Sequence, residues 1–188
     1  MSEVQPSQTG EVVPFPLHEI AVNDVLVLRE LTENDADEFY ALVERNKQHL
    51  APFMPLTVAK YRSPRRIRDR IRRERPPEAY KFGLWTENAL VGYVKLTQQN
   101  NVTVRVGYFL DDAHTGKGYM TEALNAAKRY SLDRLGYREV VAELDRRNLK
   151  SWYVLERCGF KPLGSREPTA SGEPFLLTCS YSEEDSLV

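Results

Sequence analysis

The chain has 188 residues, of which 41% are hydrophobic and 28% are charged, and its formal net charge is −1. This length fits one domain with a sizeable core and is short for two, and the composition is ordinary for a globular protein. No apolar run approaches the roughly 20 residues that a membrane helix needs, and the near-zero charge gives no general indication of nucleic-acid binding.

Cysteine and histidine are too sparse to indicate a site. The two cysteines, Cys158 and Cys179, cannot make a disulfide framework, so we expect reduced thiols, with Cys158 in the core. The three histidines are scattered without metal-ligand spacing, so we expect no metal. The N-terminus has neither a basic patch nor an apolar stretch, which predicts no secretory signal and a cytoplasmic protein.

The first part of the chain predicts an arm, a strand and two helices. Residues 1–19 contain three prolines and no periodic pattern, which is typical of a flexible arm, and residues 20–188 form the expected single domain. Thr32 and Ser63 are suitable helix caps. In chain order the pattern predicts a strand over residues 25–29 and a helix from residue 32 onward. A loop with two prolines over residues 51–58 and a second helix over residues 63–76 follow.

The rest of the chain predicts hairpins first and strand–helix alternation later. The expected strands cover residues 80–86, 90–98, 103–110, 139–144 and 175–181, and the expected helices cover residues 118–134 and 149–157. Strands joined by short turns pair antiparallel, whereas strands joined through a helix commonly pair parallel. The sequence therefore predicts an α/β fold with a mixed sheet.

One turn between a strand and a helix has a pattern suited to phosphate binding. The strand that ends at Leu110 leads through a polar loop into Gly116-Lys117-Gly118, where a helix begins. The first N–H groups of a helix are unpaired and partly positive, and glycines let an anion approach them. The P-loop and dinucleotide patterns both fail, because Tyr119 follows Gly118 and Thr121 stands in place of a third glycine. The alternative is a tight turn that needs glycine for its backbone alone.

Three blocks of sequence carry a family resemblance. They are Leu26–Ala36, Gly107–Leu124 and Asn148–Phe160. In their order and spacing they resemble the GNAT superfamily of N-acetyltransferases, and most closely its RimJ/RimL-type ribosomal-protein N-terminal acetyltransferases, over about residues 20–182. The resemblance implies the GNAT fold, with flanking helices and a central mixed, mostly antiparallel sheet that is splayed at the coenzyme-binding strand.

The resemblance also implies how acetyl-CoA would bind. The family's pyrophosphate loop is a six-residue motif that falls on Thr115–Met120. Its first position is Gln or Arg, its fourth is Gly, and its sixth is Gly or Ala. Thr115 and Met120 depart from this pattern, but backbone donors do not depend on side-chain identity. The loop would hold the pyrophosphate through Gly116, Lys117, Gly118, Tyr119, Met120 and Thr121. Tyr108, Phe109 and Leu110 would pair with the pantetheine arm, and Asn148 and Ser151 match further coenzyme contacts.

The catalytic residues are expected from the same resemblance. Glu143 precedes Asn148 by five residues, where related enzymes carry a catalytic glutamate, and the alternative is a strand carboxylate paired with an arginine. The tyrosine acid of many members is replaced by Leu155, and Ser151 matches the serine proposed as acid in RimL-type enzymes, with helix capping or packing as its alternative. A backbone N–H near Leu110 would bind the oxyanion. Tyr153 matches no acid position and is expected to pack.

A basic segment is the remaining feature. Nine Lys and Arg residues stand between positions 60 and 75, opposed by Asp69 and Glu74. Arginine at this density favours phosphate or carboxylate partners, so the Arg65–Arg75 helix is a candidate site for an acidic peptide or an RNA-bearing partner. A solvated helix face balanced by neighbouring acids is the alternative. In the family the loop with Phe53, Met54 and Leu56 would form the acceptor wall.

The sequence therefore predicts an acetyl-CoA-dependent N-acetyltransferase that acts on an amine through a ternary complex, with a protein N-terminus as the expected acceptor. The alternatives are a small-molecule acceptor, such as an amino acid, a polyamine or an antibiotic, and a non-catalytic acyl-CoA- or RNA-binding module on the same fold. We expect no membrane partner, and either a monomer or a homodimer.

Overall fold

The computed structural model describes residues 19–166 and 176–182, and within them the strands form one sheet in the order β1-β2-β3-β4-β5-β6-β8-β7. The strands are β1 (Glu19–Ala21), β2 (Val27–Glu30), β3 (Ala79–Trp85), β4 (Leu90–Gln98), β5 (Thr103–Leu110), β6 (Glu139–Asp145), β7 (Lys161–Arg166) and β8 (Leu176–Ser182). Among these pairs β5–β6 is the parallel one, and the others are antiparallel. The prediction of a mixed, mostly antiparallel sheet is confirmed.

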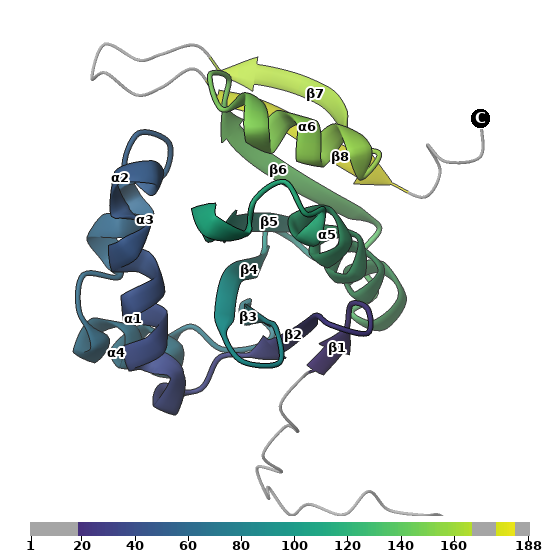
Figure 1. The fold of residues 1–188 in the computed structure, drawn as a ribbon. Coiled ribbons are helices and arrows are strands. Elements are labelled where there is room, and N and C mark those ends of the chain that lie inside the picture. Colours follow the sequence, from purple (N-terminus) through teal and green to yellow (C-terminus); the bar gives the residue numbers. More distant parts are fainter. Residues whose placement is uncertain (1–18, 167–175, 183–188) are drawn as a thin grey trace, which may run out of the picture.

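Helices cover both faces of the sheet (Figure 1). One face carries the group α1 (Ala36–Arg45), α2 (Lys47–Leu50), α3 (Pro55–Lys60) and α4 (Pro64–Arg73), and the other carries α5 (Tyr119–Arg129) and α6 (Leu149–Arg157). Short 3-10 turns precede α1 and α5, at Glu33–Asp35 and Asp112–His114, and a π-helical turn, Tyr130–Arg134, follows α5. No helix among the described residues combines the length and the apolar character that crossing a bilayer requires.

Each face of the sheet has its own core. On the α5–α6 side, Met120, Ala123, Leu124 and Ala127 follow helical spacing and pack on alternate strand residues, together with the buried thiols of Cys158 and Cys179. On the α1–α4 side, α1 buries Ala36, Phe39, Leu42 and Val43 against Tyr61, Tyr93 and Phe109. Both cores meet at β5, because its successive side chains point to opposite faces.

The sheet opens along the second half of β5. Thr103 to Val106 pair with Glu139 to Ala142 of β6, and no pairing between the two strands continues beyond Val106. On its other side β5 stays paired with β4 as far as Leu110. The expected splay at this strand is therefore present.

Four elements differ from the sequence prediction, one of them the short helix α2, which follows α1 after Asn46. Glu19, placed in the arm, begins β1, and the proline-containing loop 51–58 becomes helical at Pro55, where α3 begins. Proline fits the first turn of a helix because no N–H is needed there. β7 was not predicted, since Pro162 and Gly164 disfavour a strand, but β7 is the edge strand of this sheet and tolerates both. The rest of the arm, residues 1–18, and Phe175 lie outside the described residues.

Candidate acetyl-transfer site

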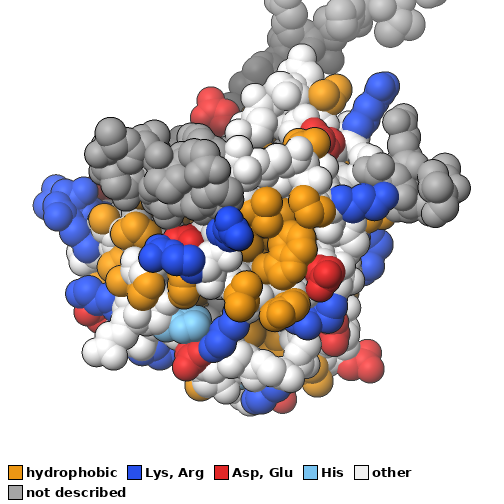
Figure 2. Space-filling model, turned by 90° about the horizontal axis from the view of Figure 1, so that it is seen from above, with side chains coloured by type: hydrophobic (Ala, Val, Ile, Leu, Met, Phe, Trp, Pro, Cys, Tyr) orange, Lys and Arg blue, Asp and Glu red, His pale blue; other side chains and the backbone are white. Residues whose placement is uncertain are grey.

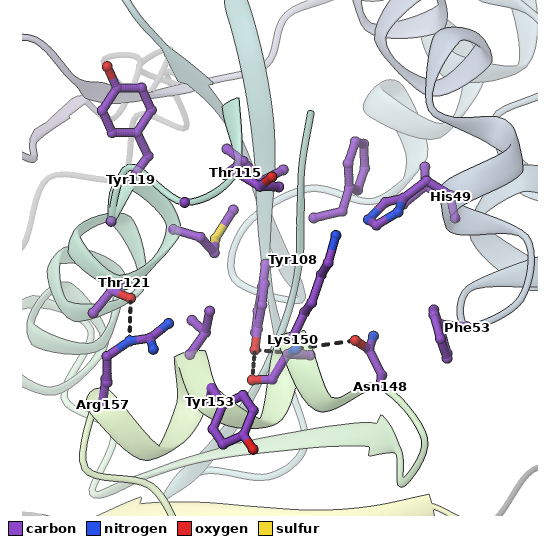
Figure 3. Close-up of a pocket in the computed structure, with 18 of the residues that line it drawn as sticks. His49, Phe53, Tyr108, Thr115, Tyr119, Thr121, Asn148, Lys150, Tyr153 and Arg157 are labelled. Atoms are coloured by element: carbon purple, nitrogen blue, oxygen red, sulfur yellow. Dashed lines mark hydrogen bonds between the residues drawn. The ribbon is translucent and has the colours of Figure 1, made fainter. Parts of the chain in front are cut away.

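A cavity of about 600 Å³ lies beside the unpaired half of β5. Four segments line it: Tyr108–Leu110 of β5, residues 115, 116 and 118–121 at the start of α5, residues 148, 150, 151, 153, 154 and 157 of α6 and its cap, and residues 49, 50, 53 and 54 of α2 and the loop after it. Figure 3 shows Tyr108 in the middle, between the α6 side with Tyr153 and the α2 side with His49. On the outside of the molecule, Figure 2 shows hydrophobic side chains gathered in a central patch with Lys and Arg around them.

The free edge of β5 offers backbone hydrogen-bonding groups to this cavity. The Asp111 N–H donates to Val91 O in β4. Because N–H groups alternate sides along a strand, those of Leu110 and Tyr108 point the other way, to the side that β6 has left. An extended ligand on that side can pair with this edge as a further strand would.

The turn into α5 exposes the start of a helix. Gly116 and Gly118 have φ of 79° and 80°, in the left-handed region that side chains disfavour, and Gly118 is the cap of α5. A Cβ on Gly116 would meet no atom within 4 Å, and one on Gly118 would come no closer than 3.8 Å to Glu122. The space before these first-turn N–H groups is therefore open, as an anion requires. Lys117 does not line the cavity, and its ammonium lies 5.7 Å from the Tyr119 ring centre.

A buried carboxylate joins the α5 turn to the helices across the cavity. Asp111 accepts hydrogen bonds from Arg45 Nε at 2.8 Å and Asn46 Nδ2 at 3.1 Å, while Asn46 Oδ1 accepts from the Asp112 N–H at 2.9 Å. Burial raises the pKa of Asp111, but the hydrogen bonds from Arg45 and Asn46 outweigh it and hold the pKa below its ordinary value. These bonds fix where α2 stands relative to the glycine turn.

Ser151 lies in the cavity wall within a small hydrogen-bond network. Its N–H donates to Asn148 Oδ1 at 3.1 Å, so Asn148 caps α6, and its Oγ lies 2.7 Å from Tyr108 Oη. Figure 3 shows both bonds, one within the start of α6 and one from α6 to Tyr108 of β5. Burial raises the pKa of Tyr108 above its ordinary value, and the bond to Ser151 opposes this only in part. The phenol is therefore a stable neutral partner for the serine hydroxyl.

Glu143 is not among the residues that line the cavity. Its Oε2 accepts from Arg105 Nη1 at 2.9 Å, which is the ion-pair arrangement that the sequence left as the alternative. Its place in the sheet follows from the pairing of β6. Ala142 is the last β6 residue paired with β5, so Glu143 is the first residue beyond the pairing, and it lies on the face of the sheet opposite the buried side chains of Val140 and Leu144.

Four residues of α6 line the cavity although no role in it was predicted for them from the sequence: Lys150, Tyr153, Val154 and Arg157. Tyr153, expected to pack, is half exposed and faces the cavity, and Lys150 and Arg157 share its helix. Positions 150, 151, 154 and 157 follow helical spacing, which could have identified this face. His49 lies in α2, and its Nδ1 is 3.7 Å from Asp112 Oδ1. No group of three or more metal-binding side chains occurs within the described residues.

Comparison with known proteins agrees with this geometry. Residues 25–161 match the family model described as the acetyltransferase (GNAT) domain. The chain is 34% identical over 148 residues to the probable N-acetyltransferase YjcK of Bacillus subtilis, which covers 74% of this chain and 82% of YjcK. It is 27% identical over 146 residues to a ribosomal-protein-serine acetyltransferase of Escherichia coli, with 75% and 82% covered.

Among solved structures, RimL, a ribosomal-protein alpha-N-acetyltransferase in complex with coenzyme A, superposes with a TM-score of 0.79 at 21% identity. The match covers 88% of this chain and 98% of RimL, so the two folds agree along nearly their whole length. The matching domain spans the open strand, the glycine turn and α6, and the chain belongs to the GNAT family of acetyltransferases.

Proposed function

We propose that this protein transfers an acetyl group from acetyl-CoA to a protein N-terminal amine. The observation that carries the proposal is the arrangement of three features around one cavity: the free edge of β5, the open helix start at Gly116–Gly118, and the hydroxyl of Ser151. They match the three parts of an acyl-CoA, which are an extended amide-containing arm, a pyrophosphate and a thioester.

The coenzyme is proposed to lie along these features in order. The N–H groups of residues 116–121 are the proposed donors for the pyrophosphate, since these residues form the turn into α5 and its first turn, and the space beside Gly116 and Gly118 is open. The edge of Tyr108 and Leu110 pairs with the pantetheine arm, and Asn148, whose Oδ1 is used to cap α6, has its Nδ2 left to donate. Arg157, whose Nε lies 3.5 Å from Thr121 Oγ1, adds positive charge beside the helix start.

The chain's own groups then account for the transfer. A neutral amine attacks the thioester carbonyl, which forms the N–C bond, and collapse of the tetrahedral intermediate breaks the C–S bond. The Leu110 N–H is the donor proposed for the oxyanion, because it points to the free side of β5. Ser151 Oγ is the group proposed to give a proton to the departing thiolate and to regain one from solvent water, with Tyr108 holding the hydroxyl in position. The proton lost by the amine passes to Glu143 through water.

The charge of the cavity favours a peptide acceptor. The described residues that line it include His49, Lys150 and Arg157 but no residue with a carboxylate side chain. A cavity without negative charge gives a polyamine or another cationic small molecule no ion-pair partner. An N-terminal amine has a pKa near 7.7–8.0, compared with about 10.4 for lysine, so it needs little help to become neutral. The relatives named as ribosomal-protein acetyltransferases support the same acceptor class.

An acceptor screen tests this proposal. Purified protein is incubated with acetyl-CoA and panels of peptides with free N-termini, N-terminally blocked peptides that contain lysine, amino acids, polyamines and aminoglycosides, and thiol release is followed. We expect turnover with free N-termini and none with the blocked peptides. Turnover confined to small molecules would replace the protein acceptor with the alternative. Acetyl-CoA binding without turnover on any amine would favour the non-catalytic module.

A further inference from the structure

The arginines of α4 divide into two sets with different surroundings. Arg68 pairs with Asp37 of α1, and Arg72 pairs with Glu33 just before α1. These two residues are one helical turn apart and hold α4 against the α1 segment, so their charge is already balanced. This half of the helix fits the solvated, balanced face that the sequence left as the alternative.

The other set lines a groove between α3 and α4. This groove has a volume of about 580 Å³. Its wall contains one carboxylate, Asp69, one hydroxyl, Ser63, and two apolar side chains, Leu56 and Ala59. It also contains five cationic side chains: Lys60, Arg65, Arg66, Arg70 and Arg73. Of the five cations, Arg70 has an acidic partner, Glu74. Within the described residues the other four make no ion pair.

The surroundings of Lys60 disfavour its charged form. Burial lowers its pKa below the ordinary value, and the positive charges of Arg70 and Lys95 lower it further, against the single opposing charge of Glu74. Positive charge that is held together without enough internal counter-charge attracts an external anion, and the attraction is strongest where several donors converge. The groove is therefore built for a ligand with more than one negative charge.

We propose that this groove binds an acidic segment of the acceptor polypeptide, downstream of the amine that is acetylated. The inference rests on the proposed function and adds a determinant of acceptor choice to it. The two sites share one wall. Met54, just before α3, lines the acetyl-transfer cavity, and Leu56 and Lys60, near the start and at the end of α3, line the basic groove.

The length of α3 sets the scale of the acidic segment. The groove residues of α3 run from Leu56, near the cavity, to Lys60 at its far end. A helix of six residues is about 9 Å long, and an extended peptide covers that distance in about three residues. We place the acidic side chains from about the fourth residue of the peptide onward, because the first residues carry the amine into the cavity.

The make-up of the groove favours a polypeptide over RNA. The described residues of its wall include no aromatic side chain on which a base could stack, and Asp69 stands among the arginines. Single-stranded nucleic acid is commonly bound by aromatic platforms together with basic tracks. Guanidinium groups with the Asp69 carboxylate among them suit acidic side chains that are spaced along a peptide.

Two acceptor peptides test the inference. They share their first three residues and carry either Glu or Gln at positions four to eight. For the wild-type protein we expect a KM about tenfold lower for the acidic peptide, because several exposed ion pairs, each of modest strength, act together. This difference should shrink at high salt, since screening shortens the reach of exposed charges. In the triple variant Arg65→Gln, Arg66→Gln, Arg73→Gln, the two KM values should become nearly equal while kcat is retained.

The matched control is the double variant Arg68→Gln, Arg72→Gln, which removes charge from the same helix but from the paired side. It should keep the preference for the acidic peptide. Equal KM values for both peptides with the wild-type protein, or an unchanged preference in the triple variant, would overturn the groove and leave the proposed function intact. Acetylation of neither peptide would remove the proposed function and the groove with it. Stronger competition by an RNA oligonucleotide than by the acidic peptide would assign the groove to RNA instead.

Discussion

Replacing Gly118 with Val separates the two physical reasons for glycine at the start of α5. The first reason is the backbone, because Gly118 has φ of 80°, where a side chain costs roughly 1–2 kcal/mol. The second is access, because the space in front of this residue is where we place the pyrophosphate. Gly136 supplies the matched control, since it has φ of 74°, is exposed, and has no atom within 4 Å of an added Cβ.

The magnitudes follow from these values. For a chain of this size, 1 kcal/mol shifts Tm by roughly 2–4 °C, so both Gly118→Val and Gly136→Val should lower the unliganded Tm by a similar few degrees. Acetyl-CoA at about 100 times its Kd should stabilise the wild type by roughly 2.7 kcal/mol. Gly136→Val should retain the resulting upward shift in Tm, and Gly118→Val should lose most of it.

Thermal melts with and without acetyl-CoA measure both effects in one experiment. A Gly118→Val protein that melts like Gly136→Val and is stabilised as strongly as the wild type would show that glycine serves only the turn. No stabilisation of the wild-type protein at millimolar acetyl-CoA would remove the coenzyme site altogether.

Two further predictions concern the cavity wall. Tyr108→Phe removes the bond to Ser151 and should lower the free energy of unfolding in urea by about 1 kcal/mol. The loss in kcat that it causes should not add to the loss caused by Ser151→Ala. Full additivity of the two losses would show that the hydroxyls act independently. The contribution of Asp111 should be complete above its ordinary pKa of 3.8 and lost as pH falls through its lower pKa in the folded protein. Asp111→Asn should lower the free energy of unfolding by about 1–3 kcal/mol at pH 6 and make this free energy less dependent on pH between pH 5 and 2. An unchanged pH dependence in this range would refute the role given to Arg45 and Asn46.

Regular elements with strong local patterns were predictable from the sequence. The strand Thr103–Leu110 and the helix Leu149–Arg157 have the predicted bounds, because alternation and helical spacing in each agree with clear turn residues at the ends. The missed elements lack such agreement. In α3, Pro55 can end one element or begin another, and only packing of the segment after it decides between them. In β7, the edge position that permits Pro162 depends on the whole sheet.

The site was predictable in its backbone and less so in its side chains. The glycine turn follows from a local motif and the open strand was implied by the family resemblance, whereas the place of Tyr153 depends on how α6 is rotated against the splayed strand. The pairing of Arg68 and Arg72 with acids of the α1 segment also depends on tertiary packing, because their partners stand more than 30 positions away in the sequence. The local density of arginine could not show which of these residues are already balanced.

Glu143 presents the remaining choice between chemistry and structure. It stands where β6 leaves β5, yet it is paired with Arg105. If it takes the amine proton through water, Glu143→Gln should lower kcat at pH 7 by up to about 100-fold, the lower end for general base catalysis. The loss should shrink above pH 8, where an N-terminal amine is already neutral. Arg105→Met breaks the same ion pair and keeps the carboxylate, so it should retain most of the rate. A similar, pH-independent loss in both variants would mean that Glu143 serves only the ion pair.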